Sequence, residues 1–180
     1  MSSQDVPVQN VSADFLEAVR RADWNLALSA IKPQDDPSDV RCPSSSPVAW
    51  LIELNAPPNV VVQCLGQCAK AEAVEADSLG LLELCIALSN ANSNALATFK
   101  ALLCAGLSPN VITDGGDTLL QHAVNLNRVP EVEELLRYGV DAHQMNMFGV
   151  ESTSNRDGAR AAGNPAGALA LAKFNERVDT

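Results

Sequence analysis

Residues 116–146, GDTLLQHAVNLNRVPEVEELLRYGVDAHQMN, predict two short helices joined by a tight turn. The side-chain oxygen of Thr118 can cap the first helix. Pro130 stands where the second helix would begin, a place where a missing backbone N–H costs little. Gly139 follows the apolar stripe of that second helix and can supply a left-handed C-cap. Each helix has one apolar stripe, so the pair cannot bury its apolar surface without neighbours.

The landmarks of this stretch recur in the sequence after 33 residues. Gly106 corresponds in this way to Gly139, and Gly116 corresponds to Gly149. The pair Leu102-Leu103 likewise corresponds to Leu135-Leu136. A fixed period of this size is typical of solenoids, in which each unit packs on the next.

The repeated stretch resembles the ankyrin-repeat family, whose usual signature runs Gly-x-Thr-Pro-Leu-His-x-Ala, then Leu-Leu, then Gly-Ala-Asp-x-Asn. The residues that match this signature are Gly116, Thr118, Leu120, Ala123, Leu135, Leu136, Gly139 and Asp141. Leu119 replaces the usual Pro, Gln121 the usual His and His143 the usual Asn, whereas the upstream copy keeps the Asn as Asn110.

The resemblance implies an all-α, ankyrin-like solenoid of about five helix pairs with short hairpin loops. It would be a single domain over residues 11–180, preceded by a flexible stretch at residues 1–10. Capping helix pairs are expected at about residues 12–32 and 150–176. Residues 32–47, rich in Pro, Ser and Asp, are expected to form a long loop, and residues 89–95 a lengthened turn.

The charge of the chain restricts its partners. With 22 acidic residues against 12 Lys and Arg, the net charge of −10 repels phosphate backbones and anionic membranes. No apolar run approaches the roughly 18 residues that a membrane span needs. The sequence therefore predicts that the chain binds neither nucleic acid nor a membrane, and it favours a protein partner with a basic surface.

The five cysteines are odd in number, and no pair has the C-x-x-C spacing of a zinc site. The sequence shows neither a secretory signal pattern nor an even set of cysteines that could all pair as disulfides. It therefore favours a reducing, cytoplasmic setting. Four of the five are expected to be mostly buried and reduced, with Cys42 the most exposed; the four are Cys64, Cys68, Cys85 and Cys104.

Few residues carry candidate chemistry. His122 and His143 have no visible nucleophile or metal partner, and Cys64 with Cys68, four apart on one helical face, have no second ligand pair. Residues 114–117, DGGD, lack the further acids of a calcium loop and predict a hairpin turn. We therefore expect no catalytic set, no metal and no cofactor.

The acids of the second helix in residues 116–146 are expected on its solvated outer face; they are Glu131, Glu133 and Glu134.

Binding in the ankyrin-repeat family usually involves the hairpin tips and the exposed side of the first helices. Carried over by alignment, this surface comprises Ile112, Asp114, Asp117, Asn125, Leu126, Met145, Met147 and Phe148. The apolar members near the tips, Ile112, Met147 and Phe148, either pack back onto the neighbouring hairpin or anchor a partner.

The leading hypothesis for function is a non-enzymatic protein–protein interaction module. In its sharper form it is a small acidic inhibitor, antitoxin or immunity-type protein that covers a basic site. One alternative is an adaptor or chaperone for a secreted protein. The other is a metal-binding protein or enzyme that uses Cys64, Cys68 and the histidines.

Overall fold

The computed structural model describes residues 13–30, 47–68, 73–113, 115–141, 144–145, 147–149 and 164–169. Within these ranges the fold is all-α, as predicted, with helices α1 (Ala13–Arg20), α2 (Trp24–Ala30), α3 (Pro47–Glu53), α4 (Pro58–Cys68), α5 (Ala73–Leu88), α6 (Ala95–Cys104), α7 (Leu119–Asn125) and α8 (Val129–Arg137). Residues 165–169 are also helical, and an isolated antiparallel bridge joins Ile112 to Thr118. Residues 1–12 and 31–46, with the expected flexible start and long loop, lie outside the described ranges.

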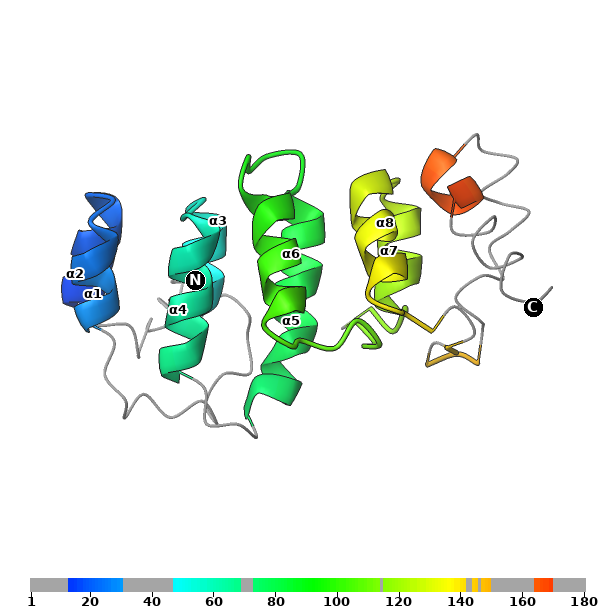
Figure 1. The fold of residues 1–180 in the computed structure, drawn as a ribbon, viewed down its shortest axis with the longest axis horizontal. Helices are drawn as coiled ribbons and strands as arrows, with labels where there is room; N and C mark the ends of the chain where they lie inside the picture. The colour runs from blue at the N-terminus through cyan, green and yellow to red at the C-terminus, as the bar shows by residue number, and fades with distance from the viewer. Residues whose placement is uncertain are drawn as a thin grey trace, which may run out of the picture.

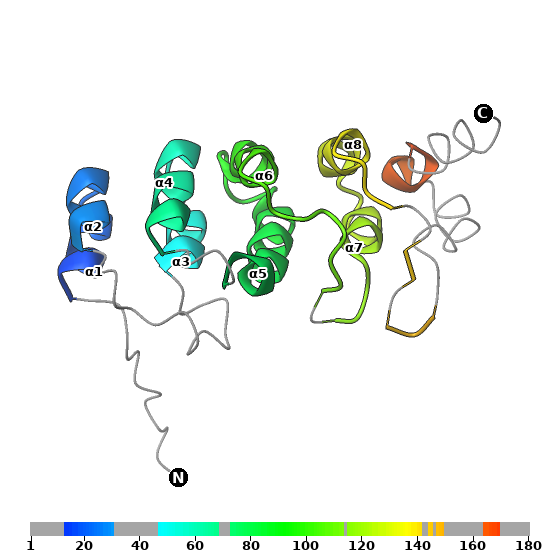
Figure 2. The same ribbon diagram turned by 60° about the horizontal axis from the view of Figure 1, so that its bottom comes forward.

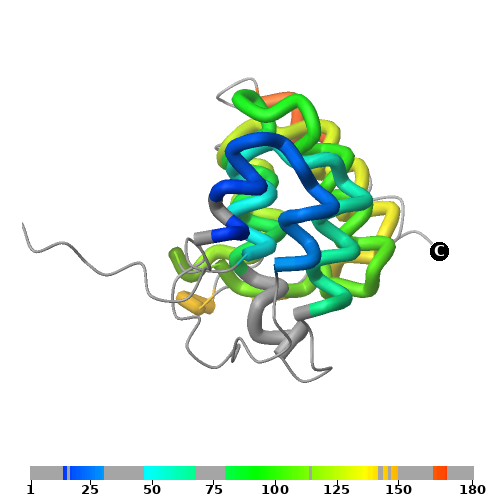
Figure 3. Tube along the Cα trace, turned by 90° about the vertical axis from the view of Figure 1, so that its left-hand side faces the viewer, coloured from blue at the N-terminus to red at the C-terminus, as the bar shows by residue number. Residues whose placement is uncertain are grey.

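The helices are arranged as successive pairs side by side in a row (Figure 1). Figure 2 shows that α1, α3, α5 and α7 form one layer and that α2, α4, α6 and α8 form the other. Viewed along the row in Figure 3, the pairs lie one behind another. From α2 onward, the helices pack on the helix of their own layer in the next pair, as α3 does on α5 and α6 on α8.

The turns inside the pairs share one backbone hydrogen bond, which fixes the register of the first-layer helices. The amide of Asn55 donates to the carbonyl of Ile52 at 3.1 Å, and the amide of Asn127 donates to that of Val124 at 3.0 Å. In α1 the corresponding carbonyl is that of Val19, which accepts from the amide of Ala22 at 2.9 Å. In α5 it is that of Ile86, which accepts from the amide of Ser89 at 3.4 Å. Val19, Ile52, Ile86 and Val124 therefore occupy equivalent positions.

The 33-residue period of the sequence is also a period of the backbone. Gly106 and Gly139 both have positive φ, +100° and +75°, and each ends a second-layer helix. The amide after each glycine donates back into that helix, from Leu107 to Leu102 at 3.2 Å and from Val140 to Leu135 at 3.0 Å. A side chain at these φ values is strained, which explains why glycine recurs there.

The core runs along the whole row, between the layers and between the pairs. Its largest fully buried apolar side chains include Phe15, Leu51, Leu82, Phe99 and Leu135. Leu136, beside the fully buried Leu135, is half-buried and packs against this core. Leu54 is exposed just beyond the end of α3. None of the described helices combines the length and hydropathy that a membrane span requires.

The lengthened turn between α5 and α6 is a packing element. The Nδ2 group of Asn92 donates to the carbonyl of Ile52 at 2.8 Å, near the end of α3. At the equivalent place on α7, the Nδ2 group of Asn164 donates to the carbonyl of Val124 at 2.6 Å. These two asparagines thus satisfy free carbonyls at helix ends and attach one segment of the row to the next.

Candidate functional site

The hairpin before α7 is held by local hydrogen bonds. Thr118 and Gln121 form a reciprocal cap, in which each side chain accepts from the other residue's amide, at 3.2 and 3.0 Å. Across the hairpin, the amide of Thr113 donates to the carbonyl of Asp117 at 2.7 Å. Gly116 turns the chain with φ +86°. The predicted cap and hairpin turn are both confirmed, and together they fix the loop against α7.

Met147 and Phe148 lie over this hairpin while remaining exposed. The amide of Met147 donates to the carbonyl of Gly116 at 3.0 Å. A Cβ atom on Gly116 would collide with the Met147 side chain and would lie 3.1 Å from Cε2 of Phe148. Nevertheless 67% of Met147 and 68% of Phe148 remain open to solvent. The residues therefore rest on the neighbouring hairpin and still present most of their apolar surface outward, while the role of partner anchors stays a prediction.

The other members of the predicted surface lie in different parts of the hairpin and of α7. Ile112 is half-buried at the bridge to Thr118, and Met145 is exposed two residues before Met147. Asp117 accepts a hydrogen bond from Nδ2 of Asn125 at 3.3 Å, which links the hairpin to the end of α7.

Leu126 is exposed at the far end of α7, and Asp114 lies outside the described residues. We call Met145, Met147 and Phe148 the hairpin edge.

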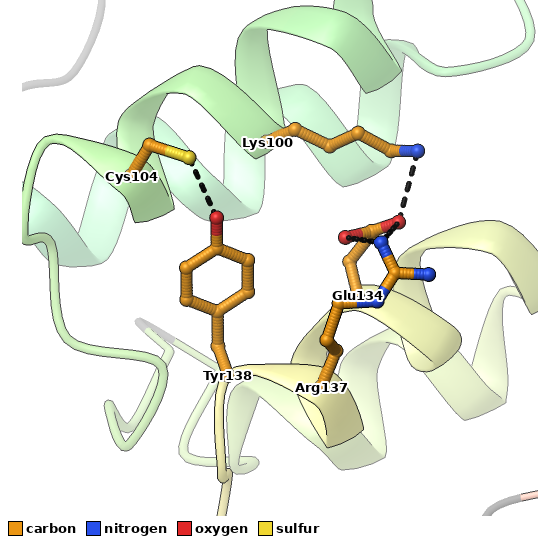
Figure 4. A network of polar contacts seen from close by, with 5 residues as sticks. All are labelled: Lys100, Cys104, Glu134, Arg137 and Tyr138. Atoms are coloured by element: carbon orange, nitrogen blue, oxygen red, sulfur yellow. Dashed lines mark hydrogen bonds and ion pairs between the residues drawn. The ribbon is translucent and has the colours of Figure 1, made fainter.

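A polar network between α6 and α8 contradicts one prediction (Figure 4). The carboxylate of Glu134 lies 2.9 Å from Nζ of Lys100 and 3.0 Å from Nη1 of Arg137, and its side chain is only 5% exposed. Glu131 is buried as well, and accepts a hydrogen bond from the hydroxyl of Ser89. The expected solvated face therefore holds for Glu133 but is wrong for Glu131 and Glu134.

The reason lies in the helix geometry. Glu131 and Glu134 share with Leu135 the face of α8 that packs against the preceding pair, because residues three and four apart lie on one side of a helix. Thr98, one period before Glu131, is likewise a polar residue on a buried face.

Cys104 and Tyr138 form a second contact missed from the sequence. Cys104 was expected to be buried, but it is exposed at the end of α6, with Sγ 2.6 Å from the hydroxyl of Tyr138. Figure 4 shows the two side chains pointing toward each other beside the Glu134 network. This hydrogen bond is the main cause that raises the pKa of Tyr138, with smaller contributions from partial burial and neighbouring negative charge.

The other described thiols are buried. Cys64 and Cys85 lie in the core, as predicted. Burial raises the pKa of Cys85 from 9.0 to about 12, and the nearby Glu131 carboxylate adds to the increase. Cys42 and the side chain of Cys68 lie outside the described residues.

The structure describes one of the two histidines. His122 is half-buried on α7, and its Nε2 has no hydrogen-bond partner among the residues that the structure describes. His143 lies outside them. The described side chains form no group of three or more His, Cys, Asp or Glu arranged to hold a metal ion.

Comparisons of the chain with protein-family models and with curated proteins find no match.

Proposed function

We propose that this protein is a non-enzymatic protein-binding module, built as an ankyrin-like solenoid. The observation that carries the proposal is the hairpin edge, where three large apolar side chains project into solvent next to a rigid hairpin. Exposed apolar clusters of this kind are typical of protein interfaces, in which a few buried anchors provide most of the affinity.

The ankyrin-like part of the proposal rests on the repeated details of the backbone. Gly116 and Gly149 both have positive φ, +86° and +72°, at the hairpin positions one period apart. Gly106 and Gly139 also have positive φ, at the ends of the second-layer helices and likewise one period apart. Hairpins that project from one layer of a row of helix pairs support this class of solenoid.

The charge of the chain indicates the kind of partner. A net charge of −10 attracts a basic surface and accelerates its encounter with the hairpin edge. Our specific proposal is a small acidic inhibitor, antitoxin or immunity-type protein that covers a basic site. An adaptor or chaperone would use the same surface, and differs in that its bound partner stays active.

The proposal can be tested with a photo-crosslinking amino acid in place of Phe148 on the hairpin edge. The matched control places it at Leu26, which is 47% exposed on α2 in the first pair. Crosslinking in extracts of the native host should join the Phe148 position to a basic protein and leave the Leu26 position unlinked. Equal crosslinking from both positions would contradict a binding role for the hairpin edge.

A further inference from the structure

The hairpin edge concentrates the methionines of the chain. The sequence has three of them, Met1, Met145 and Met147, so both internal methionines belong to this edge. Figure 2 shows their segment, drawn in orange, beside the hairpin that precedes α7. In the part of the chain that the structure describes, the buried apolar side chains are those of Ala, Val, Leu, Ile, Phe and Cys. Methionine commonly fills gaps inside cores, so its place at an exposed edge calls for another explanation.

The repeat does not require methionine at these positions. The residue one period before Met145 is Ile112, which is half-buried at the bridge to Thr118. The residue one period before Met147 is the charged Asp114. Equivalent positions of the repeat therefore accept side chains without sulfur. Compared with leucine or isoleucine, methionine adds a flexible chain and a sulfur that can be oxidised.

The thioethers of the hairpin edge are open to small oxidants. Met145 is 59% exposed and Met147 is 67% exposed. Sδ of Met147 lies against Gly116, where a Cβ atom would collide with it, so the hairpin holds this sulfur at the surface. A dissolved oxidant reaches both side chains without any opening of the fold.

The described thiols are less suited to the same reaction or lie elsewhere. Cys64 and Cys85 are buried, and burial raises the pKa of Cys85 to about 12, which keeps it in the unreactive thiol form. Cys104 is exposed, but it ends α6 in the other layer, with Sγ on the hydroxyl of Tyr138. Oxidation of Cys104 would leave the hairpin edge unchanged.

The reaction with hydrogen peroxide is balanced without any other reagent. The thioether sulfur attacks one peroxide oxygen, so that an S–O bond forms while the O–O bond breaks. The sulfur loses two electrons, and the second oxygen leaves as water with both peroxide protons. The product is a sulfoxide, which is uncharged but polar and accepts hydrogen bonds from water.

Oxidation would change the polarity of the hairpin edge and leave its charge unaltered. Two of its three side chains would carry a polar oxygen, and burying such an oxygen in an apolar contact is unfavourable without a hydrogen bond. Since apolar anchors provide most of the affinity of an interface, a partner should bind less tightly. The fold should persist, because Met145 and Met147 lie outside the buried core.

We propose that Met145 and Met147 form a reversible oxidation site, at which peroxide makes the hairpin edge polar and releases its partner. The inference rests on the proposed binding function and specifies how binding is regulated. Methionine sulfoxide reductases, one for each epimer of the sulfoxide, would restore the apolar edge.

The experiment treats the protein with dilute hydrogen peroxide and then with dithiothreitol, which reverses disulfides and sulfenic acids but not sulfoxides. Mass spectrometry of peptides gives the oxidation rate of each methionine. Retention on a phenyl resin measures the exposed apolar surface, and the crosslinking yield from position 148 measures capture of the partner. The matched control is Met145→Leu/Met147→Leu, which keeps the apolar side chains and has no sulfur at the edge.

We expect both methionines to be oxidised within about threefold of the rate of free N-acetylmethionine amide, because both are exposed. The oxidised parent should elute earlier from the phenyl resin, and its crosslinking yield should fall at least about fivefold, with unchanged circular dichroism. The two reductases should restore both values. Peroxide should change neither retention nor yield in the double leucine variant.

Three results would overturn the oxidation site: oxidation of both methionines at least about tenfold more slowly than the free amide, unchanged retention of the oxidised parent, or an equal loss of yield in the double leucine variant. If a partner crosslinks at position 148 equally before and after oxidation, the proposed function stands and the switch is wrong. If no partner crosslinks at position 148 in the untreated protein, the proposed function is wrong and the switch falls with it.

Discussion

Two regions of the molecule depart from the usual pattern of apolar inside and polar outside. The layer of α3, α5 and α7 presents Leu54 and Leu126 to solvent, whereas the layer of α6 and α8 buries the carboxylates of Glu131 and Glu134. The polarity of a side chain therefore does not reveal its side of the row. Its position relative to the next pair decides burial, and departures from the usual pattern are informative in both directions.

The buried acids are held by partners from the neighbouring pair. Lys100 on α6 reaches Glu134 on α8, and Ser89 after α5 donates its hydroxyl to Glu131. A buried carboxylate needs such partners because desolvation opposes its charge. An exposed leucine needs no such partner, so replacing it should disturb the fold much less than replacing a buried residue.

The largest effect is expected when a buried leucine is replaced, and an exposed leucine serves as the comparison. Leu135→Ala removes a fully buried side chain of α8 and should lower the free energy of unfolding by about 2–5 kcal/mol. Leu126→Ala, at a position 42% exposed, should change it by less than about 0.5 kcal/mol. Urea denaturation of both variants measures the difference. Similar losses would show that Leu126 contributes to packing rather than to a binding surface.

An intermediate effect concerns pH and Cys85. Because the pKa of this thiol is about 12 in the folded protein and near 9.0 when unfolded, its contribution to stability is present below pH 9 and is lost as the pH rises toward 12. At pH 10 the loss should be on the order of 1 kcal/mol relative to neutral pH.

The control variant is Cys85→Ala, which has no thiol to ionise. Denaturation of both proteins at pH 7.5 and pH 10 gives the comparison. An equal alkaline loss in the parent and the variant would show that Cys85 ionises freely in the folded protein.

The smallest effect concerns the exposed contact in the second layer. Tyr138 is the single tyrosine of the chain, so its ionisation can be followed by ultraviolet absorbance without interference from others. Its pKa should lie above the ordinary value of 10.0, and Cys104→Ala should lower it toward that value by removing the hydrogen bond. A pKa unaffected by Cys104→Ala would mean that the contact does not persist in solution.

The sequence was sufficient to predict the features that depend on local backbone chemistry. Thr118, Gly139 and the 33-residue spacing correctly located a cap, a helix end and a repeated turn, because each depends on its immediate neighbours. The helix pairs expected at about residues 12–32 and within residues 116–146 correspond to α1 with α2 and to α7 with α8.

The sequence failed where the outcome depends on contacts between pairs. Glu134 is buried because Lys100, 34 residues away, covers it, and a helical pattern alone places it on the solvated face. Asn92 donates to a carbonyl 40 residues away, so the sequence of residues 89–95 predicts only a lengthened turn and not its packing role. The hairpin edge was located in part, since Met147 and Phe148 were named but their packing on Gly116 depends on the fold.

The central claim is that the hairpin edge binds a partner, and Phe148→Ala tests it most directly. The measurement is the affinity of the variant for the crosslinked partner, by calorimetry, together with its free energy of unfolding. We predict that binding weakens by more than about 1 kcal/mol while stability changes by less than about 0.5 kcal/mol, because Phe148 is 68% exposed. Unchanged affinity accompanied by unfolding of the C-terminal region would contradict the account and show that Phe148 is a packing residue.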